Sequence, residues 1–262
     1  MPLQRTAELR TKYVRVHRQG WMPIMVGDRL NALQLAEVCV EAGMQAVEIT
    51  CRRERVKEEL RAIKSRFPDL IVLVGSIVEE PRLLAYLRTI RSGMPSMEEL
   101  ADCGADGFVS QYCFRSETLE RYADSHLLIP GVETVREATE AIRYGAHFVK
   151  FVSVSPERIG QINSDATHRL FPIFYTGGIT VPLIAAYLGK GAVLLGGGWD
   201  MMLGDQYIRQ QDNPEPTVLH EKLMRYVSEF RQCRTPAADG CEAPETADDD
   251  YLRQLRHYHP FA

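Results

Sequence analysis

The strongest constraint on the fold is an alternation of short apolar segments with amphipathic ones that persists over about 200 residues. The apolar segments have the length of β-strands, and the stretches between them repeat apolar residues at helical spacing. Parallel strands need a crossover connection, and a helix is the usual one. We therefore expect a parallel sheet built from eight segments: Trp21–Met25, Ala46–Thr50, Ile71–Gly75, Gly107–Ser110, Leu127–Pro130, Phe148–Val152, Ile173–Thr176 and Val193–Gly196.

Eight such units match an α/β fold of the (β/α)8 TIM barrel type, whose usual size is roughly 250 residues. The same alternation could build an open doubly wound sheet, but no G-x-G-x-x-G motif follows the first strand, which disfavours its dinucleotide-binding form. A helix over residues 8–19 is expected to pack across one barrel end. An extra helix is expected in residues 79–98, a segment that is longer than a simple crossover.

The domain prediction is a single barrel at residues 1–233, followed by a flexible acidic linker and C-terminal tail at residues 234–262. The stretch from Arg234 to Asp250 is rich in Pro, Ala, Gly and acidic residues, a composition typical of flexible linkers. Two alternatives stay open for the apolar residues of the tail. They could dock as a short helix, or they could bind another subunit.

Composition excludes several classes of protein. Lys and Arg total 31 against 35 Asp and Glu, a formal net charge of −4, so binding of nucleic acid by bulk electrostatics is not expected. No apolar run approaches the roughly 18 residues of a membrane span. The six cysteines are scattered without a C-x-x-C pair, which indicates reduced thiols in the cytoplasm. His257 and His259 lie close together in the tail, and the sequence favours a surface position for them over a metal site.

Two charged residues are enclosed in apolar strand segments. Lys150 lies between Phe148-Val149 and Phe151-Val152, and Glu48 lies within Ala46–Thr50, with Arg52 four residues later. A buried ammonium must be paired or lose its proton. A low-pKa amine beside a raised-pKa carboxylate is suited to imine chemistry. The alternatives are a lysine that reaches solvent or pairs without chemistry, and a Glu48–Arg52 ion pair that only stabilises the barrel.

Glycine-rich turns follow the last two strand segments. Gly177-Gly178 comes after the seventh, and Gly197-Gly198 ends the eighth. Successive glycines let backbone N–H groups converge on an anion. The loops after strands seven and eight are the recurring phosphate site of TIM barrels. Glycine also marks ordinary tight turns, so the indication of a phosphate site comes from the pairing of the two turns.

Taken together, the segments resemble the 2-keto-3-deoxy-6-phosphogluconate (KDPG) and 4-hydroxy-2-oxoglutarate aldolases from about Met22 to Gly204. The resemblance implies that Lys150 forms a Schiff base and that Glu48 moves protons. It also implies a homotrimer, and no cofactor or metal is expected because the imine itself polarises the substrate. The segments that carry the resemblance are Glu48–Arg52, Pro130-Gly131-Val132 with Thr134, Val149–Phe151, Thr176–Ile179 and Gly196–Trp199.

The same resemblance implies binding roles. Arg52 and Ser76 would hold a pyruvate carboxylate, and Thr176 and Gln111 would line the pocket. Phosphate binding would fall to the turn glycines Gly177, Gly178, Gly197 and Gly198. The prediction is a class I aldolase that cleaves a 2-keto-3-deoxy-6-phospho sugar acid to pyruvate and glyceraldehyde 3-phosphate.

This chain departs from the family pattern at the distal end of the expected pocket. Gly198 stands where the family has a phosphate-binding serine, and Ser110-Gln111 stands where it has S-P. Three alternatives therefore stay open. They are a pyruvate aldolase for an unphosphorylated 2-keto acid such as 4-hydroxy-2-oxoglutarate, a non-catalytic sugar-acid-binding barrel, and a phosphosugar isomerase that leaves Lys150 unused.

Overall fold

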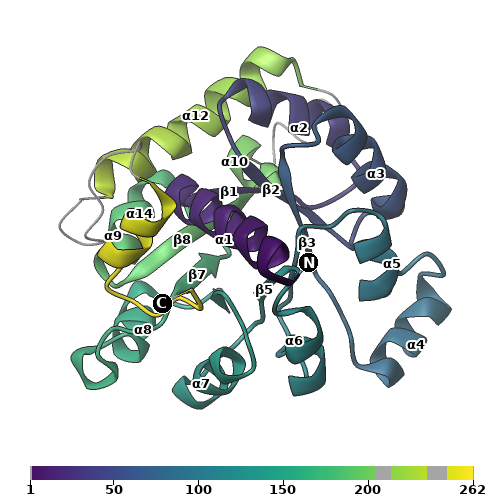
Figure 1. Ribbon diagram of the computed structural model, residues 1–262. Helices are drawn as coiled ribbons and strands as arrows, with labels where there is room; N and C mark the ends of the chain where they lie inside the picture. Colours follow the sequence, from purple (N-terminus) through teal and green to yellow (C-terminus); the bar gives the residue numbers. More distant parts are fainter. Residues whose placement is uncertain (1, 205–213, 235–246, 262) are drawn as a thin grey trace.

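The computed structural model describes residues 2–204, 214–234 and 247–261. Its strands form one parallel sheet in the order β5-β4-β3-β2-β1-β8-β7-β6, with helices around the outside (Figure 1). The strands are β1 (Trp21–Met25), β2 (Ala46–Thr50), β3 (Ile71–Gly75), β4 (Gly107–Val109), β5 (Leu127–Ile129), β6 (Val149–Val152), β7 (Ile173–Thr176) and β8 (Ala192–Gly198).

The two end strands of this order meet and close the sheet. Gly131, just beyond β5, makes an isolated parallel bridge with Lys150 of β6. The Lys150 amide donates to the Pro130 carbonyl at 2.8 Å, and the Val132 amide donates to the Lys150 carbonyl at 2.9 Å. The (β/α)8 barrel predicted from the sequence is confirmed, with strand ends that differ by one or two residues.

Some of the helices between the strands begin at hydroxyl caps that the sequence contains. Ser96 and Thr134 each accept from the amide three residues later and form a complete capping box with Glu99 and Glu137. The described helices outside the barrel are α2 (Ala32–Glu41), α3 (Val56–Arg66), α4 (Pro81–Ile90), α5 (Met97–Asp102), α6 (Ser116–Tyr122), α7 (Val135–Arg143), α8 (Pro156–Ile162), α9 (Ile184–Gly189), α10 (Trp199–Leu203) and α12 (Pro216–Cys233). The extra helix expected in residues 79–98 is α4. No described helix is long and apolar enough to cross a membrane.

Two apolar layers hold the barrel together. One lies between the strands and the outer helices, and the other fills the barrel interior. The interior layer is covered at the amino ends of the strands by α1 (Pro2–Gln19), which runs across that end of the barrel (Figure 1). Tyr13 of α1 is fully buried and stacks on Phe148, with ring centroids 4.8 Å apart. This capped end leaves the carboxyl ends of the strands as the accessible mouth.

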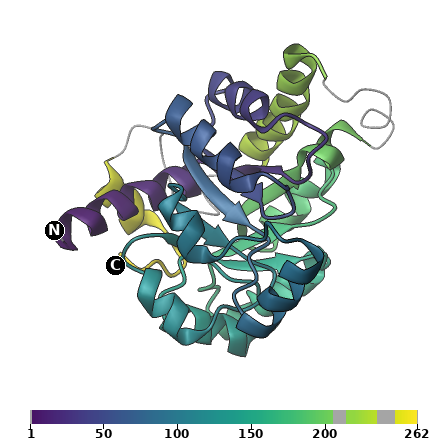
Figure 2. The same ribbon diagram turned by 90° about the vertical axis from the view of Figure 1, so that its right-hand side faces the viewer.

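The C-terminal tail is docked on α1. Helix α14 (Asp248–Gln254) lies beside α1 (Figure 2), and its Tyr251 and Leu252 are buried. The expectation of surface histidines in the tail is wrong. His257 is 9% exposed and His259 8% exposed, because α1 and the tail enclose their imidazoles. His17 of α1 hydrogen-bonds to Tyr251 Oη at 2.7 Å and to His257 at 2.8 Å. Of the linker predicted at 234–250, residues 235–246 lie outside the described residues, whereas Asp248–Asp250 form the first turn of α14.

Candidate active site

A cavity of about 360 Å³ opens at the carboxyl ends of the strands. This is the end at which TIM barrels carry their active sites, because the loops that follow the strands converge there. The structure brings every residue that the sequence placed in the site to the wall of this one cavity. These residues are Glu48, Arg52, Ser76, Gln111, Lys150, Thr176, Gly177, Gly178, Gly197 and Gly198.

The centre of the cavity is a buried amine and carboxyl pair. Lys150 Nζ lies 3.8 Å from Glu48 Oε1, and the two residues are 7% and 1% exposed. Period two of the strands sends both side chains into the barrel, where Phe174 lies under the Lys150 ammonium with its ring centroid 5.4 Å away. Glu48 Oε2 is buried and has no hydrogen-bond partner among the described residues. That oxygen is therefore an unsatisfied acceptor inside the barrel.

Burial shifts the protonation of this pair toward the neutral forms. Desolvation lowers the pKa of Lys150, and the nearby Arg52 charge adds to the effect, while Glu48 opposes it. Desolvation likewise raises the pKa of Glu48 against the opposing charges of Lys150 and Arg52. An uncharged amine is a nucleophile and a protonated carboxyl is a proton donor, so the geometry and the electrostatics equip the pair for attack on a carbonyl.

Arg52 is placed at the rim by the turn that ends β2. Its amide donates to Thr50 Oγ1 at 3.3 Å, and its carbonyl accepts from Arg91 at 2.6 Å. The next residue, Arg53, is buried and holds two loops together. It pairs with Glu59 at 2.6 Å and donates to the Leu30 carbonyl at 2.8 Å. Sequence reasoning missed Arg53, although an arginine directly after a buried strand, with an acid six residues later, is a usable signal.

Ser76 follows β3 with φ of 58°, in the left-handed region that non-glycine residues seldom adopt. Such backbone conformations cluster at ligand sites, because the surrounding structure must hold them in place. The conformation turns the chain at the cavity, which Ser76 lines together with Arg52 and Glu48. Ser76 follows β3 and the other two belong to or follow β2, the neighbouring strand. A hydroxyl and a guanidinium that line one cavity suit a ligand carboxylate.

The glycine turns line the cavity at the ends of β7 and β8. Gly177 and Gly178 have φ of 104° and 69°, which only glycine adopts easily. Gly198 has an ordinary φ of −66°, so its backbone does not require glycine. The space is used instead by Asp200, whose carboxylate folds over the Gly198 Cα and also lines the cavity. Sequence reasoning missed Asp200, which lies two residues after Gly198.

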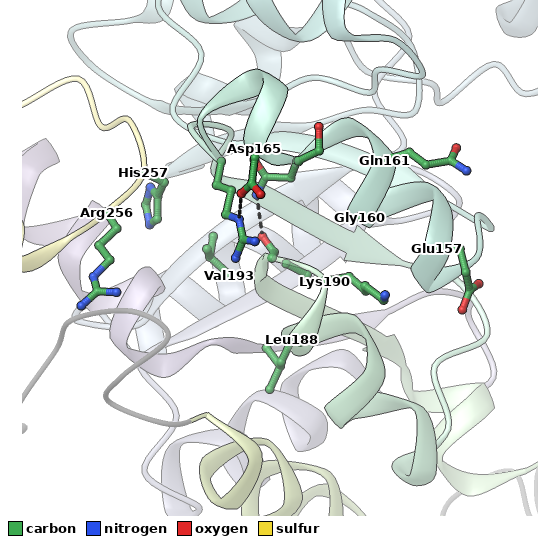
Figure 3. Close-up of a pocket in the computed structure, with 15 residues that line it drawn as sticks. Glu157, Gly160, Gln161, Asp165, Leu188, Lys190, Val193, Arg256 and His257 are labelled. Carbon is green, nitrogen blue, oxygen red and sulfur yellow. Dashed lines mark hydrogen bonds and ion pairs between the residues drawn. The ribbon is translucent and has the colours of Figure 1, made fainter.

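A second hollow of about 750 Å³ lies at the other end of the barrel, between α8, α9 and the tail residues Arg256 and His257 (Figure 3). Six of its fifteen lining residues are exposed polar or charged residues. Arg169 there is engaged with Asp165 at 2.9 Å. The buried Lys150–Glu48 pair belongs to the smaller cavity, so the smaller cavity is the candidate active site.

Comparison with known proteins identifies the family. The family model of the KDPG and KHG aldolases matches residues 15–217. The KHG/KDPG aldolase of Escherichia coli strain K12 is 29% identical over 189 residues, which cover 68% of this chain and 79% of that protein.

Two solved structures share the fold. Native KDPGal has a TM-score of 0.63 at 20% identity and covers 81% of this chain and 95% of its own. The KDPG aldolase of Legionella pneumophila, solved with pyruvate captured as a covalent carbinolamine intermediate, has a TM-score of 0.60 at 21% identity and covers 82% and 95%. The chain belongs to the KDPG and KHG aldolase family of carbon–carbon lyases.

Proposed function

We propose that this protein is a class I pyruvate aldolase that cleaves a 2-keto-3-deoxy sugar acid through a Schiff base on Lys150. The observation that carries the proposal is the buried Lys150 amine 3.8 Å from the Glu48 carboxyl, in a cavity that Arg52 also lines. A non-catalytic binding barrel has no use for this pair, and an isomerase leaves Lys150 idle. The Legionella pneumophila relative, solved as a pyruvate carbinolamine, supports the same covalent chemistry here.

Formation of the imine uses both neutral groups. A solvated lysine is uncharged in only about one molecule in 2,500 at pH 7, so the lowering of the Lys150 pKa by burial increases the available nucleophile. The amine attacks the C2 carbonyl carbon of the substrate and forms a carbinolamine. Protonated Glu48 then gives its proton to the departing hydroxyl, which leaves as water. The products of this step are a protonated imine and a Glu48 carboxylate.

Cleavage returns the proton to Glu48. The carboxylate accepts the proton of the C4 hydroxyl, the C3–C4 bond breaks, and its electron pair moves into the imine to give a neutral enamine and an aldehyde. Glu48 then protonates C3 of the enamine, which restores the protonated imine and leaves Glu48 as a carboxylate. Water hydrolyses this imine to free pyruvate and the neutral Lys150 amine, and the proton released in that step returns to Glu48. Throughout the cycle, Arg52 and Ser76 hold the carboxylate of the 2-keto acid.

Two kinds of acceptor end, meaning the distal half of the substrate that leaves as the aldehyde, are compatible with this chemistry. The glycine turns of β7 and β8 support the 6-phosphorylated sugar acid predicted from the sequence, whose second product is glyceraldehyde 3-phosphate. The Asp200 carboxylate in the same part of the cavity favours an unphosphorylated 2-keto acid. The proposal includes the homotrimer implied by the family resemblance and the cytoplasmic location expected from the cysteines.

Trapping with borohydride tests the proposal. Incubation with pyruvate and sodium borohydride should add one reduced pyruvate adduct, and peptide mass spectrometry should locate it on Lys150. Lys150→Met should abolish the adduct and aldol cleavage together. Lys190→Met is the matched control, because this exposed lysine lies outside the active-site cavity. This variant should keep both the pyruvate adduct and aldol cleavage. A wild-type protein that stays unlabelled would refute the Schiff-base mechanism.

A further inference from the structure

The part of the active-site cavity that would hold the acceptor end of the substrate contains a carboxylate, that of Asp200. The charged residues that line the cavity, within the described ranges, are Glu48, Arg52, Lys150 and Asp200. The proposed mechanism assigns both cations to the pyruvate half of the substrate. Lys150 forms the imine and Arg52 holds the carboxylate. Asp200 is therefore the charged side chain that remains for the other half.

The position of Asp200 follows from Gly198. A methyl group built on Gly198 would overlap Asp200 Oδ1 and lie 3.4 Å from Asp200 Cγ. The φ and ψ of Gly198, −66° and 142°, are accessible to any residue. The missing side chain thus provides room rather than backbone freedom, and the carboxylate of Asp200 occupies that room. A serine at this position would meet the same obstruction from the carboxylate.

The other side chains at this corner of the cavity are apolar, and Asp200 itself is exposed. Val26 Cγ2 would lie 2.9 Å from the same built methyl group, and Met201 Cε would lie 2.9 Å from one built on Gly197. Both residues are apolar, and both line the cavity beside Asp200. An ionised carboxylate only accepts hydrogen bonds, so it matches a ligand group that donates them. A phosphate dianion offers acceptors and a like charge, which is the usual way in which a site rejects a competitor.

We propose that Asp200 determines the specificity of the acceptor end: it excludes phosphorylated substrates and binds the distal hydroxyls of an unphosphorylated 2-keto-3-deoxy sugar acid. This inference rests on the proposed function, because it takes the Lys150 imine as the fixed end of the substrate. The turns Gly177-Gly178 and Gly197-Gly198 then leave space for a hydroxylated carbon chain instead of a phosphate.

The test compares cleavage of 2-keto-3-deoxygluconate with cleavage of its 6-phosphate. Wild-type protein should show the higher kcat/KM on the unphosphorylated acid. Asp200→Asn removes the charge at nearly constant size, and it should raise kcat/KM on the phosphorylated acid by about 10- to 100-fold, equivalent to roughly 1.4–2.8 kcal/mol. Asp200→Glu keeps the charge and should keep the preference. Asp165→Asn, on the far side of the barrel, should leave both rates unchanged.

Two results would overturn the inference. One is a wild-type preference of tenfold or more for the phosphorylated acid, and the other is an Asp200→Asn variant that changes both rates equally. Borohydride trapping of pyruvate on the wild-type protein separates this failure from failure of the proposed function. A pyruvate adduct on Lys150 with a preference for phosphate refutes only the role of Asp200, whereas an absent adduct refutes the Schiff base itself.

Discussion

The substitution Gly75→Ala tests the position of the Lys150–Glu48 pair without replacing either residue. Gly75 ends β3 and pairs with Thr50 of β2 across the sheet. A methyl group built on Gly75 would lie 2.7 Å from Glu48 Cδ and closer still to Oε1. Carbon atoms in contact lie about 3.5–4.0 Å apart, so the Glu48 carboxyl must move by roughly 1 Å. Gly75 is therefore required for the space that it leaves to Glu48.

The expected loss is large for one methyl group. A misplacement of about 1 Å at a catalytic group costs on the order of 100-fold in rate, or roughly 2.7 kcal/mol. Overpacking should also lower the free energy of unfolding by about 1–3 kcal/mol. The assay is kcat/KM for pyruvate release, with urea unfolding to show that the variant is folded. Gly189→Ala is the control, because a methyl group there meets no heavy atom within 4 Å.

A double-mutant cycle separates displacement of Glu48 from general damage. Glu48→Gln alone should remove most of the activity, and adding Gly75→Ala to it should cost little more, because the group that the methyl displaces no longer transfers protons. Two results would refute the reasoning. One is a folded Gly75→Ala variant with wild-type kcat/KM, and the other is a loss that is fully additive with that of Glu48→Gln.

Two further predictions concern stability. Burial lowers the pKa of His147 to about 3. Between pH 6.5 and 3 the unfolded chain therefore binds a proton that the native state does not. As the pH is lowered through this range, the free energy of unfolding should decrease by up to about 1.4 kcal/mol per pH unit. His147→Gln should flatten urea-unfolding stability between pH 6.5 and 4.5 relative to wild type, whereas parallel curves would contradict this reasoning. Arg53→Met should lower the free energy of unfolding by roughly 3 kcal/mol, since it strands Glu59 and two loop carbonyls, whereas Arg66→Met on the surface should change it by less than about 0.5 kcal/mol. Equal urea midpoints for the two arginine variants would show that the buried pair contributes nothing.

The tertiary structure corrected the sequence interpretation most clearly at the tail. His257 and His259 sit in a polar segment, so a surface position followed from their local surroundings. Their burial depends on α1, more than 230 positions earlier: His17 hydrogen-bonds to His257, and the ring centroid of Tyr13 lies 6.5 Å from that of His259. Hydropathy patterns report the environment within one element. They contain no information on two distant segments that pack on each other.

The barrel and the inward direction of Lys150 and Glu48 could be predicted from the sequence, because both depend on the pattern of residues within single strands and helices. Alternating strands and helices set the topology, and period two sends Lys150 and Glu48 inward, where a charge enclosed by apolar neighbours stands out. The spaces that shape the cavity depend on the tertiary structure. Several features of the site are contacts that the sequence pattern does not reveal. They are the space that Gly75 leaves for Glu48, the carboxylate of Asp200 over Gly198, and the hydrogen bonds of Arg53 to the loop after β1. Contacts of this kind arise only when the folded backbone sets distances that sequence spacing does not encode.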